Sequence, residues 1–322
     1  MKKALIFGIT GMDGYCLTKL LLSKDYKIYG AIRRHSQPSI GNLVNLPQNA
    51  FEKVIINYSD VTDTSSVYRL IAGIQPDEIY NFAAQSHVKI SWDNPDITYQ
   101  INTGGTLNIL NAMYLASRKS RLYFAGTSEQ FGNSKDEKQN EKTPFNPQSP
   151  YAVSKVAAFN YVKNYRESYG LYACSGITFN HEHEFRGLEF VTRKISYHVA
   201  MIKKGFLKEL HLGNIESKRD WGYAEDYMEA IWLMLQQDKP QDYVIGTGEV
   251  YSVKEFLEIA FNHVGLNWQD YVVIDDNFKR PVDINCLRAD ASKIKKELGW
   301  EPKVKFEELV KKMVEYDMER IK

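Results

Sequence analysis

The feature that most constrains the fold is a set of three glycines near the N-terminus. Gly8, Gly11 and Gly14 follow a short apolar run at residues 4–7 and precede a helical pattern at 17–22. Glycines at this spacing allow a tight turn between a strand and a helix, and they let the backbone approach a ligand closely. The amides at the start of that helix can bind a pyrophosphate. The pattern therefore predicts a dinucleotide-binding turn, with a glycine-rich turn that binds nothing as the simpler alternative.

The rest of the first half alternates between short apolar runs and helical patterns. Further strands are expected at 26–32, 54–56, 78–82 and 121–125, and further helices at 65–74 and 103–115. This alternation indicates an α/β fold, with a Rossmann-like doubly wound parallel sheet and helices on both of its faces.

The C-terminal part follows a different pattern. Ser252 and Glu255 have capping-box spacing ahead of a helical stretch at 256–264. An apolar stripe between residues 306 and 314 predicts a last helix with one side in the core. We expect a smaller mixed α/β C-terminal domain, interleaved with the first. The expected boundaries are 1–180 plus about 210–250 for the dinucleotide-binding domain, and about 181–209 plus 251–322 for the second domain.

Charge and composition argue against several classes of protein. The 41 basic and 40 acidic residues leave a net charge of +1, which gives no global attraction to nucleic acid or to an anionic membrane. Cys16, Cys174 and Cys286 have no paired spacing, so neither a disulfide framework nor a cysteine zinc site is expected. No apolar run is long enough for a membrane span, and no signal peptide is recognisable, so we expect a cytoplasmic protein.

The residues after the second expected strand indicate which dinucleotide binds. An acidic residue at this point holds the ribose hydroxyls of NAD. Here the chain instead has Arg33, Arg34, His35 and Ser36. Guanidinium groups and a hydroxyl suit a 2′-phosphate, so we predict NADP, with a solvated basic loop as the alternative. Asp60, just past the third expected strand, could accept from the adenine amino group.

Candidate reacting groups follow the strand at 121–125. Tyr151 and Lys155 are spaced so that both face the same side of a helix. A nearby ammonium and a nicotinamide cation would lower the pKa of Tyr151 and make it a usable base. Thr127 or Ser128 could bind a substrate hydroxyl, and Glu129 could move a second proton.

Taken together, these motifs resemble the GDP-mannose 4,6-dehydratase family of extended short-chain dehydrogenases/reductases. The resemblance runs nearly end to end and also covers residues 81–88, 180–182, 190–194, 218–222 and 280–281. It implies an NADP-dependent nucleotide-sugar 4,6-dehydratase, a lyase that converts GDP-mannose to GDP-4-keto-6-deoxymannose. The larger domain would bind NADP and the smaller one the nucleotide sugar. The same chemistry on a GDP-manno-heptose, a 4-oxidase or 4-epimerase, and a non-catalytic NADP-binding sensor remain alternatives.

The resemblance also implies a role for each reacting group. Tyr151 would take the proton of the sugar 4-hydroxyl while hydride leaves C4 for NADP. Glu129 would remove the C5 proton, the C6 hydroxyl would leave as water, and the hydride would return to C6. Thr127 would orient the 4-oxygen, and Lys155 would tune Tyr151. Elimination needs the extra acid/base group Glu129, whereas epimerisation or simple reduction does not.

The remaining implied contacts fall into two groups. Cofactor contacts are expected from Gly8, Thr10, Gly11, Met12, Asp13, Gly14, Arg33, Arg34, Ser36, Asp60, Val61, Ala83, Gln85, Ser86, Tyr151, Lys155, His181 and Arg186. Substrate contacts are expected from Ser86, Val88, Glu129, Asn180, Val191, Lys194, Gly213, Arg219, Arg280 and Asp283, with Arg193 near the diphosphate. A homotetramer is expected, with a dimer as the second choice, because in relatives the loop after the two arginines reaches a neighbouring subunit.

Several positions depart from the family pattern. His183, Glu184 and Phe185 precede Arg186 where the family has a serine and a proline, and Gly126 stands where it commonly has serine. Asp283 and Asn285 replace a glutamate and an aspartate. These changes leave the identity of the sugar open. His181 and His183 would share one face of an extended segment, but the chemistry needs no metal, so no metal is predicted.

Overall fold

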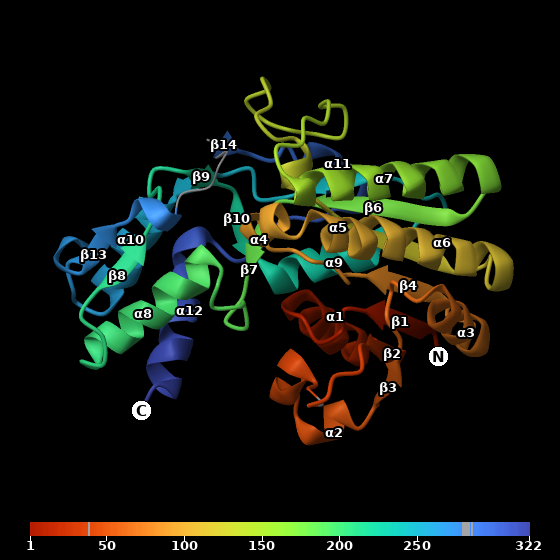
Figure 1. Cartoon of the computed structure of the whole chain (residues 1–322), viewed down its shortest axis with the longest axis horizontal. Coiled ribbons are helices and arrows are strands. Elements are labelled where there is room, and N and C mark those ends of the chain that lie inside the picture. The colour runs from red at the N-terminus through yellow and green to blue at the C-terminus, as the bar shows by residue number, and fades with distance from the viewer. Residues whose placement is uncertain (38, 279–283, 285) are drawn as a thin grey trace.

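The computed structural model describes residues 1–37, 39–278, 284 and 286–322 (Figure 1). The expectations for Arg280, Asp283 and Asn285 therefore concern positions outside the described residues.

A seven-stranded parallel sheet forms the centre of the larger part, in the order β11-β6-β5-β4-β1-β2-β3. Its strands are β1 (Lys3–Phe7), β2 (Lys27–Ile32), β3 (Val54–Tyr58), β4 (Glu78–Asn81), β5 (Arg121–Thr127), β6 (Tyr172–Thr178) and β11 (Tyr243–Ile245). β1 pairs with β2 on one side and β4 on the other, so the strand order reverses at β1. In sheets of this kind, such a reversal opens a crevice at the carboxyl ends of the strands.

Helices cover both faces of this sheet (Figure 1). One face carries α1 (Met12–Ser23), α9 (Ala224–Met234) and α11 (Ser292–Leu298). The other face carries α3 (Thr64–Ile74), α6 (Gly105–Ala116) and α7 (Pro150–Tyr169). The expected fold class, a Rossmann-like doubly wound sheet, is confirmed, as are the five expected strands; β6 and β11 were not among the predicted strands.

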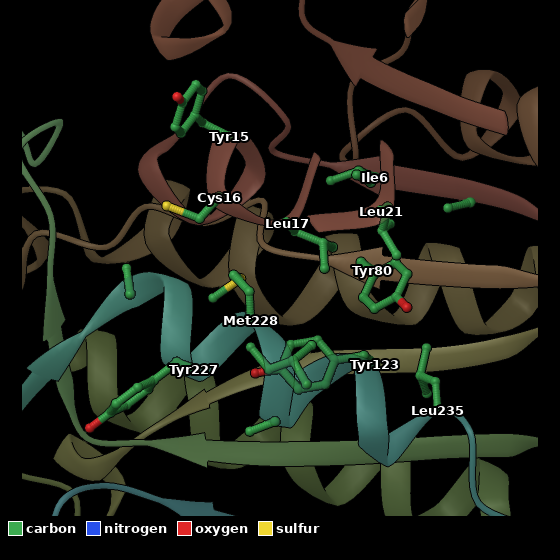
Figure 2. Packing of buried hydrophobic residues seen from close by; sticks show 14 of the residues in the cluster. Ile6, Tyr15, Cys16, Leu17, Leu21, Tyr80, Tyr123, Tyr227, Met228 and Leu235 are labelled. Atoms are coloured by element: carbon green, nitrogen blue, oxygen red, sulfur yellow. The ribbon is translucent and has the colours of Figure 1, made fainter. Parts of the chain in front are cut away.

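The layer between α1, α9 and the sheet holds the start of α1 in place. Figure 2 shows Leu17 and Leu21 of α1 and Met228 of α9 beside Tyr80 and Tyr123 of the sheet. All five side chains are fully buried. Because full burial of one such leucine contributes about 2 kcal/mol, this packing stabilises the position of α1 and of the glycine turn that precedes it.

Shorter elements connect these layers. They are α2 (Gln48–Phe51), α4 (Val88–Asp93), α5 (Pro95–Tyr99), a π-helical turn (Gln100–Gly104), and 3₁₀ turns at Gly41–Asn45, Ser128–Gln130, Trp268–Asp270 and Asp276–Phe278. The helix expected at 103–115 is thus α6, entered through a π-helical turn.

A second group of elements packs at one end of the sheet (Figure 1). Its helices are α8 (Val191–Lys203), α10 (Val253–His263) and α12 (Phe306–Arg320), and its strands are β7 (Asn180–Glu182), β8 (Leu210–Leu212), β9 (Lys218–Arg219), β10 (Trp221–Tyr223), β12 (Tyr251–Ser252), β13 (Val272–Ile274) and β14 (Cys286–Leu287). The expected capping box is present, since Ser252 Oγ accepts from Glu255 N at 3.1 Å and Glu255 Oε2 accepts from Ser252 N at 2.6 Å. The stripe on α12 lies in the core with Trp221 and Phe256, as predicted.

In the described part of the chain, no helix combines the length and the apolar character that a membrane span needs.

Candidate functional site

A cavity of about 660 Å³ lies where the strand order reverses, beyond the carboxyl ends of β1, β2, β4 and β5. Segments far apart in the sequence line it: the glycine turn, the residues after β2 and β4, the end of β5, the start of α7, and β7. Most of the predicted cofactor residues line this cavity: Gly8, Thr10, Gly11, Met12, Asp13, Gly14, Arg33, Asp60, Val61, Ala83, Gln85, Ser86, Tyr151, Lys155, His181 and Arg186.

The glycine turn lines this cavity, and the backbone around it leaves no room for a side chain at Gly8 or at Gly14. Gly8 has a φ of +80°, and a Cβ there would lie 2.8 Å from the amide nitrogen of Ala83. A Cβ on Gly14 would lie 2.5 Å from both the carbonyl oxygen of Gly8 and Cα of Ile9. Within the described residues, no side chain caps the start of α1. This cradle of backbone amides fits a pyrophosphate.

Asp13 and His181 form an ion pair beside that turn. His181 Nε2 lies 3.0 Å from Asp13 Oδ1, and His181 Nδ1 lies 2.9 Å from the carbonyl oxygen of Phe179. Both neighbours are acceptors, so this arrangement stabilises the protonated ring, in which both nitrogens donate. Burial lowers the pKa of His181, but Asp13 outweighs it and the net pKa is raised. Burial likewise raises the pKa of Asp13, yet the charge of His181 brings it below its ordinary value. The pair joins α1 to β7.

Tyr151 and Lys155 lie on the first turns of α7, as predicted. The helix begins where Ser149 Oγ accepts from Ala152 N at 3.1 Å, with Pro150 at the first helical position. Lys155 is buried and donates to the carbonyl oxygen of Ala125 at 2.8 Å. Burial lowers the pKa of Lys155 to about 8, against the opposing effect of Asp13.

The pKa of Tyr151 was expected to be lowered by an ammonium together with a nicotinamide cation, and the protein groups without that cation do not lower it. Burial raises the pKa of Tyr151 to about 12, although a hydrogen bond with the Thr127 side chain acts in the opposite direction. The protein alone therefore leaves Tyr151 as a neutral phenol at neutral pH, because the loss of water around the phenolate outweighs the neighbouring positive charges.

A second cavity, of about 290 Å³, continues from the first toward α8 and β9. Ser86, Thr127, Glu129, Tyr151, Asn180 and Arg186 line both cavities. Predicted substrate residues that line the second cavity alone are Val88, Val191, Lys194, Gly213 and Arg219. The candidate reacting groups Thr127, Glu129 and Tyr151 thus stand where a dinucleotide cavity and a second ligand cavity meet.

Basic side chains of the second cavity are held by backbone carbonyls. Lys194 donates to the carbonyl oxygen of His211 at 2.6 Å, and burial lowers the pKa of Lys194. Arg219 donates to the carbonyl oxygens of Ile284 at 2.7 Å and Lys218 at 2.9 Å. A lysine and an arginine on one cavity wall suit an anionic ligand such as a diphosphate.

Some predicted residues lie elsewhere. Arg34 and Ser36 are exposed and do not line either cavity, and the Arg34 guanidinium donates to the carbonyl oxygen of His35. Arg193 does not line them either; it is buried in an ion pair with Asp317 and donates to the carbonyl oxygen of Glu184 at 2.9 Å.

The sequence reasoning missed other lining residues. His35 and Ser39 line the first cavity, and Glu189 lines both. His35 belongs to the motif at 33–36 but was given no contact of its own, and proximity to the motifs at 33–36 and 190–194 was the only signal for Ser39 and Glu189. No group of three or more possible metal ligands occurs among the described residues. His183 lies against Tyr223, with Nδ1 3.0 Å from Glu184 Oε2.

Known proteins similar to this chain agree with the family resemblance found in the sequence. Residues 5–313 match the sequence family described as GDP-mannose 4,6 dehydratase. The chain is 50% identical over 329 residues to GDP-mannose 4,6 dehydratase 1 of Arabidopsis thaliana, across 100% of this chain and 91% of the relative.

Two solved structures superpose on it closely. One is the UDP-glucose 4-epimerase of Thermus thermophilus in complex with NAD, with a TM-score of 0.87, 26% identity, and coverage of 99% of this chain and 100% of that one. The other is DesIV, a dTDP-glucose 4,6-dehydratase from Streptomyces venezuelae with NAD and TYD bound, with a TM-score of 0.87, 25% identity, and coverage of 99% and 97%.

Proposed function

The chain belongs to the GDP-mannose 4,6-dehydratase family, and on this premise we propose that it converts GDP-mannose to GDP-4-keto-6-deoxymannose. One observation carries the proposal: Thr127, Glu129 and Tyr151 line both the dinucleotide cavity and the second cavity. A hydroxyl, a carboxyl and a phenol at the meeting point of the two cavities suit a reaction that oxidises a sugar carbon and moves more than one proton.

The other reactions are less well supported. A 4-oxidase or a 4-epimerase needs Tyr151 and Lys155 but has no use for a second acid/base group at Glu129. The same argument disfavours a non-catalytic sensor. A GDP-manno-heptose remains the second candidate substrate, since His183 and Glu184 depart from the family pattern next to Arg186, which lines both cavities.

The proposed cofactor is NADP. The cradle formed by Gly8 and Gly14 fits the pyrophosphate, and the solved structures of the epimerase and of DesIV are complexes with NAD. Arg33 lines this cavity, and its guanidinium suits a 2′-phosphate. Asp60 lines the same cavity and would accept from the adenine amino group. When bound, the cofactor would supply the acceptor for the hydride from C4, the donor of a hydride to C6 and, in its oxidised form, a positive charge in the site.

The chain's own groups move the protons. Once the ammonium of Lys155 and the positive charge of a bound oxidised cofactor have lowered its pKa, Tyr151 as the phenolate would take the proton of the sugar 4-hydroxyl. Thr127 Oγ1 accepts from Glu129 N at 3.3 Å, so its own hydrogen is available for Tyr151 or for the sugar 4-oxygen.

Elimination is the task of Glu129. Its carboxylate takes the C5 proton, made acidic by the 4-keto group, and delivers a proton to the departing C6 hydroxyl, which leaves as water. The proton taken by Tyr151 from the 4-hydroxyl balances the one that C5 regains, so the net loss is one water.

The substrate side follows from charge. We propose that Lys194 and Arg219 bind the diphosphate, with Asn180 beside them, as lining residues of the second cavity.

The larger domain would consist of 1–180 plus about 210–250, and the substrate domain of about 181–209 plus 251–322. Leu210 and Leu212 of β8 and Trp221 of β10, which these bounds place in the larger domain, pack in the core around α8, α10 and α12.

A homotetramer, with a dimer as the second choice, is the proposed assembly, and the cytoplasm is the proposed location. Val44, in the 3₁₀ turn Gly41–Asn45, is 69% exposed, which supports a contact there. Light scattering that gives a monomer at micromolar concentration would contradict the assembly.

Mass spectrometry of GDP-mannose incubated with the protein and NADP tests the proposed reaction. We expect loss of one water with no net NADPH. Glu129→Gln should remove this product, whereas Glu137→Gln, an exposed carboxylate paired with Arg288 outside both cavities, should not. Loss of two hydrogens with accumulating NADPH would mean an oxidase, and an unchanged mass would mean that GDP-mannose is not dehydrated.

A further inference from the structure

We propose that Gln130 is a positioning residue that binds Thr127 N and thereby holds the turn carrying Glu129 for the elimination step, and that Gly126 provides the space it needs. The inference rests on the proposed function of the same site. Neither residue was predicted to have a role, although Gly126 was noted as a departure from the family pattern.

Gln130 binds the turn that carries the reacting groups. Its side chain is fully buried, and its Oε1 accepts from Thr127 N at 2.8 Å. Thr127 Oγ1 accepts in turn from Glu129 N, so the 3₁₀ turn Ser128–Gln130 is closed by a capping box. The carbonyl oxygen of Gln130 accepts from Asn146 N at 2.9 Å, which anchors the end of the turn. Both ends of the segment from Thr127 to Gln130 are therefore held.

The orientation of this amide follows from its partner. Thr127 N is a donor, so the side-chain atom that faces it must be the oxygen. Nε2 of Gln130 is then buried, with no hydrogen-bond partner among the described residues. A buried donor without a partner destabilises a fold, and an apolar side chain of equal length would not carry that cost. What such a side chain would lose is the acceptor for Thr127 N.

The absence of a side chain at Gly126 leaves the space that the Gln130 amide occupies. A Cβ on Gly126 would lie 2.9 Å from Gln130 Oε1 and 3.0 Å from the carbonyl oxygen of Gly176. The second contact is with the backbone of the neighbouring strand β6, which cannot move freely. An added methyl would therefore displace the Gln130 amide from Thr127 N.

The consequence falls unequally on the two halves of the reaction. Glu129, which acts in the elimination, lies within this turn. Thr127 is also held as the last residue of β5, paired with Thr178 of β6, and Tyr151 and Lys155 lie on α7. A displacement of about 1 Å at a reacting group costs on the order of 100-fold in rate. Without the Gln130 contact, removal of the C5 proton should slow more than oxidation at C4, so the oxidised sugar and the reduced cofactor should accumulate.

The test replaces Gln130 with methionine, which has similar length and no acceptor oxygen for Thr127 N. We expect kcat for dehydration to fall about 10- to 100-fold, with a smaller change in KM. We also expect a rise in absorbance at 340 nm after rapid mixing with GDP-mannose that the wild type lacks. Affinity for GDP, measured by calorimetry, should stay unchanged. Gly126→Ala should give the same rise in absorbance. The kcat of the double variant should be no lower than that of the more impaired single variant, since both changes remove the same contact between Gln130 Oε1 and Thr127 N.

Gln139→Met is the matched control. Gln139 is also a buried glutamine whose Oε1 accepts a backbone hydrogen bond, from Arg288 N at 2.9 Å, but it lines neither cavity. The Gln139→Met variant should have a lower melting temperature but show no rise in absorbance at 340 nm. The inference is overturned if Gln130→Met shows wild-type kcat, or if it loses activity with no rise in absorbance at 340 nm. A wild-type protein that does not dehydrate GDP-mannose overturns the proposed function itself, and the inference with it.

Discussion

The substitution Gly14→Ala tests whether the glycine turn is set by contact with its own backbone. Gly14 lies in the first turn of α1, and an added Cβ would lie 2.5 Å from the carbonyl oxygen of Gly8 and 2.5 Å from Cα of Ile9. Favourable carbon contacts lie at roughly 3.5–4.0 Å, so the methyl would overlap the turn by about 1 Å. The atoms it meets are backbone atoms, which cannot rotate away.

Two opposing terms set the magnitude. Overpacking of a close-packed region costs about 1–3 kcal/mol, whereas alanine in place of glycine in a helix gains about 0.5–1 kcal/mol. We expect a net loss of about 1–2 kcal/mol in the free energy of unfolding. The turn must also shift away from the pyrophosphate site, and loss of one hydrogen bond to a charged group weakens binding roughly 10- to 100-fold.

Urea unfolding and NADP titration measure these two effects. Gly73→Ala is the matched control, because Gly73 lies in helix α3 and a Cβ there meets nothing within 4 Å. It should stabilise the fold by up to about 1 kcal/mol and leave NADP binding unchanged. Equal stability changes of the same sign in the two variants would refute the reasoning, since the same chemical change would then act without regard to the contacts at Gly14.

Three further predictions address the proposed site. Tyr151→Phe should lower kcat by about 10²–10⁴-fold in steady-state assays, and wild-type turnover in this variant would mean that another group takes the 4-hydroxyl proton. The pair of Asp13 and His181 should stabilise the fold most between about pH 4 and 6.5, because the folded pKa of Asp13 lies below its ordinary value and that of His181 above it. The contribution of Asp13 is lost as pH falls through its folded pKa, and that of His181 is lost as pH rises through its own. In urea unfolding, His181→Gln should therefore lower the free energy of unfolding more at pH 6 than at pH 9. Equal losses at the two pH values would contradict the ion pair. Lys194→Met should weaken GDP binding about 10- to 100-fold by calorimetry, and an unchanged affinity would remove Lys194 from the diphosphate site.

The local parts of the structure could be predicted well. The strands β1 to β5, the glycine turn, the capping box at Ser252 and the helix that presents Tyr151 and Lys155 all follow from short-range patterns. Apolar periodicity and glycine spacing report on neighbours within a few residues, so the sequence contains this information directly. The short strands β7 to β10 have no such pattern, because their partners lie far away in the chain.

The charged residues show that short-range sequence patterns do not predict the partners of long side chains. Arg33, Arg34 and Arg193 look alike in the sequence, yet only Arg33 lines a cavity, and Arg193 pairs with Asp317, which lies 124 positions away. The direction of a long flexible side chain depends on which partner the fold brings within reach. The pKa of Tyr151 likewise depends on burial by several distant segments, which no spacing reveals.

The sequence by itself determined the fold class and the family, and it was enough to propose the dinucleotide turn and the candidate reacting groups. Only the tertiary structure decided that Thr127, Glu129 and Tyr151 lie where two cavities meet, that Asp13 pairs with His181, and that Gln130 folds back onto Thr127. The physical reason is that secondary structure and turn chemistry arise from interactions between near neighbours. Cavities, ion pairs and pKa values arise from burial, which exists only once distant segments have packed together.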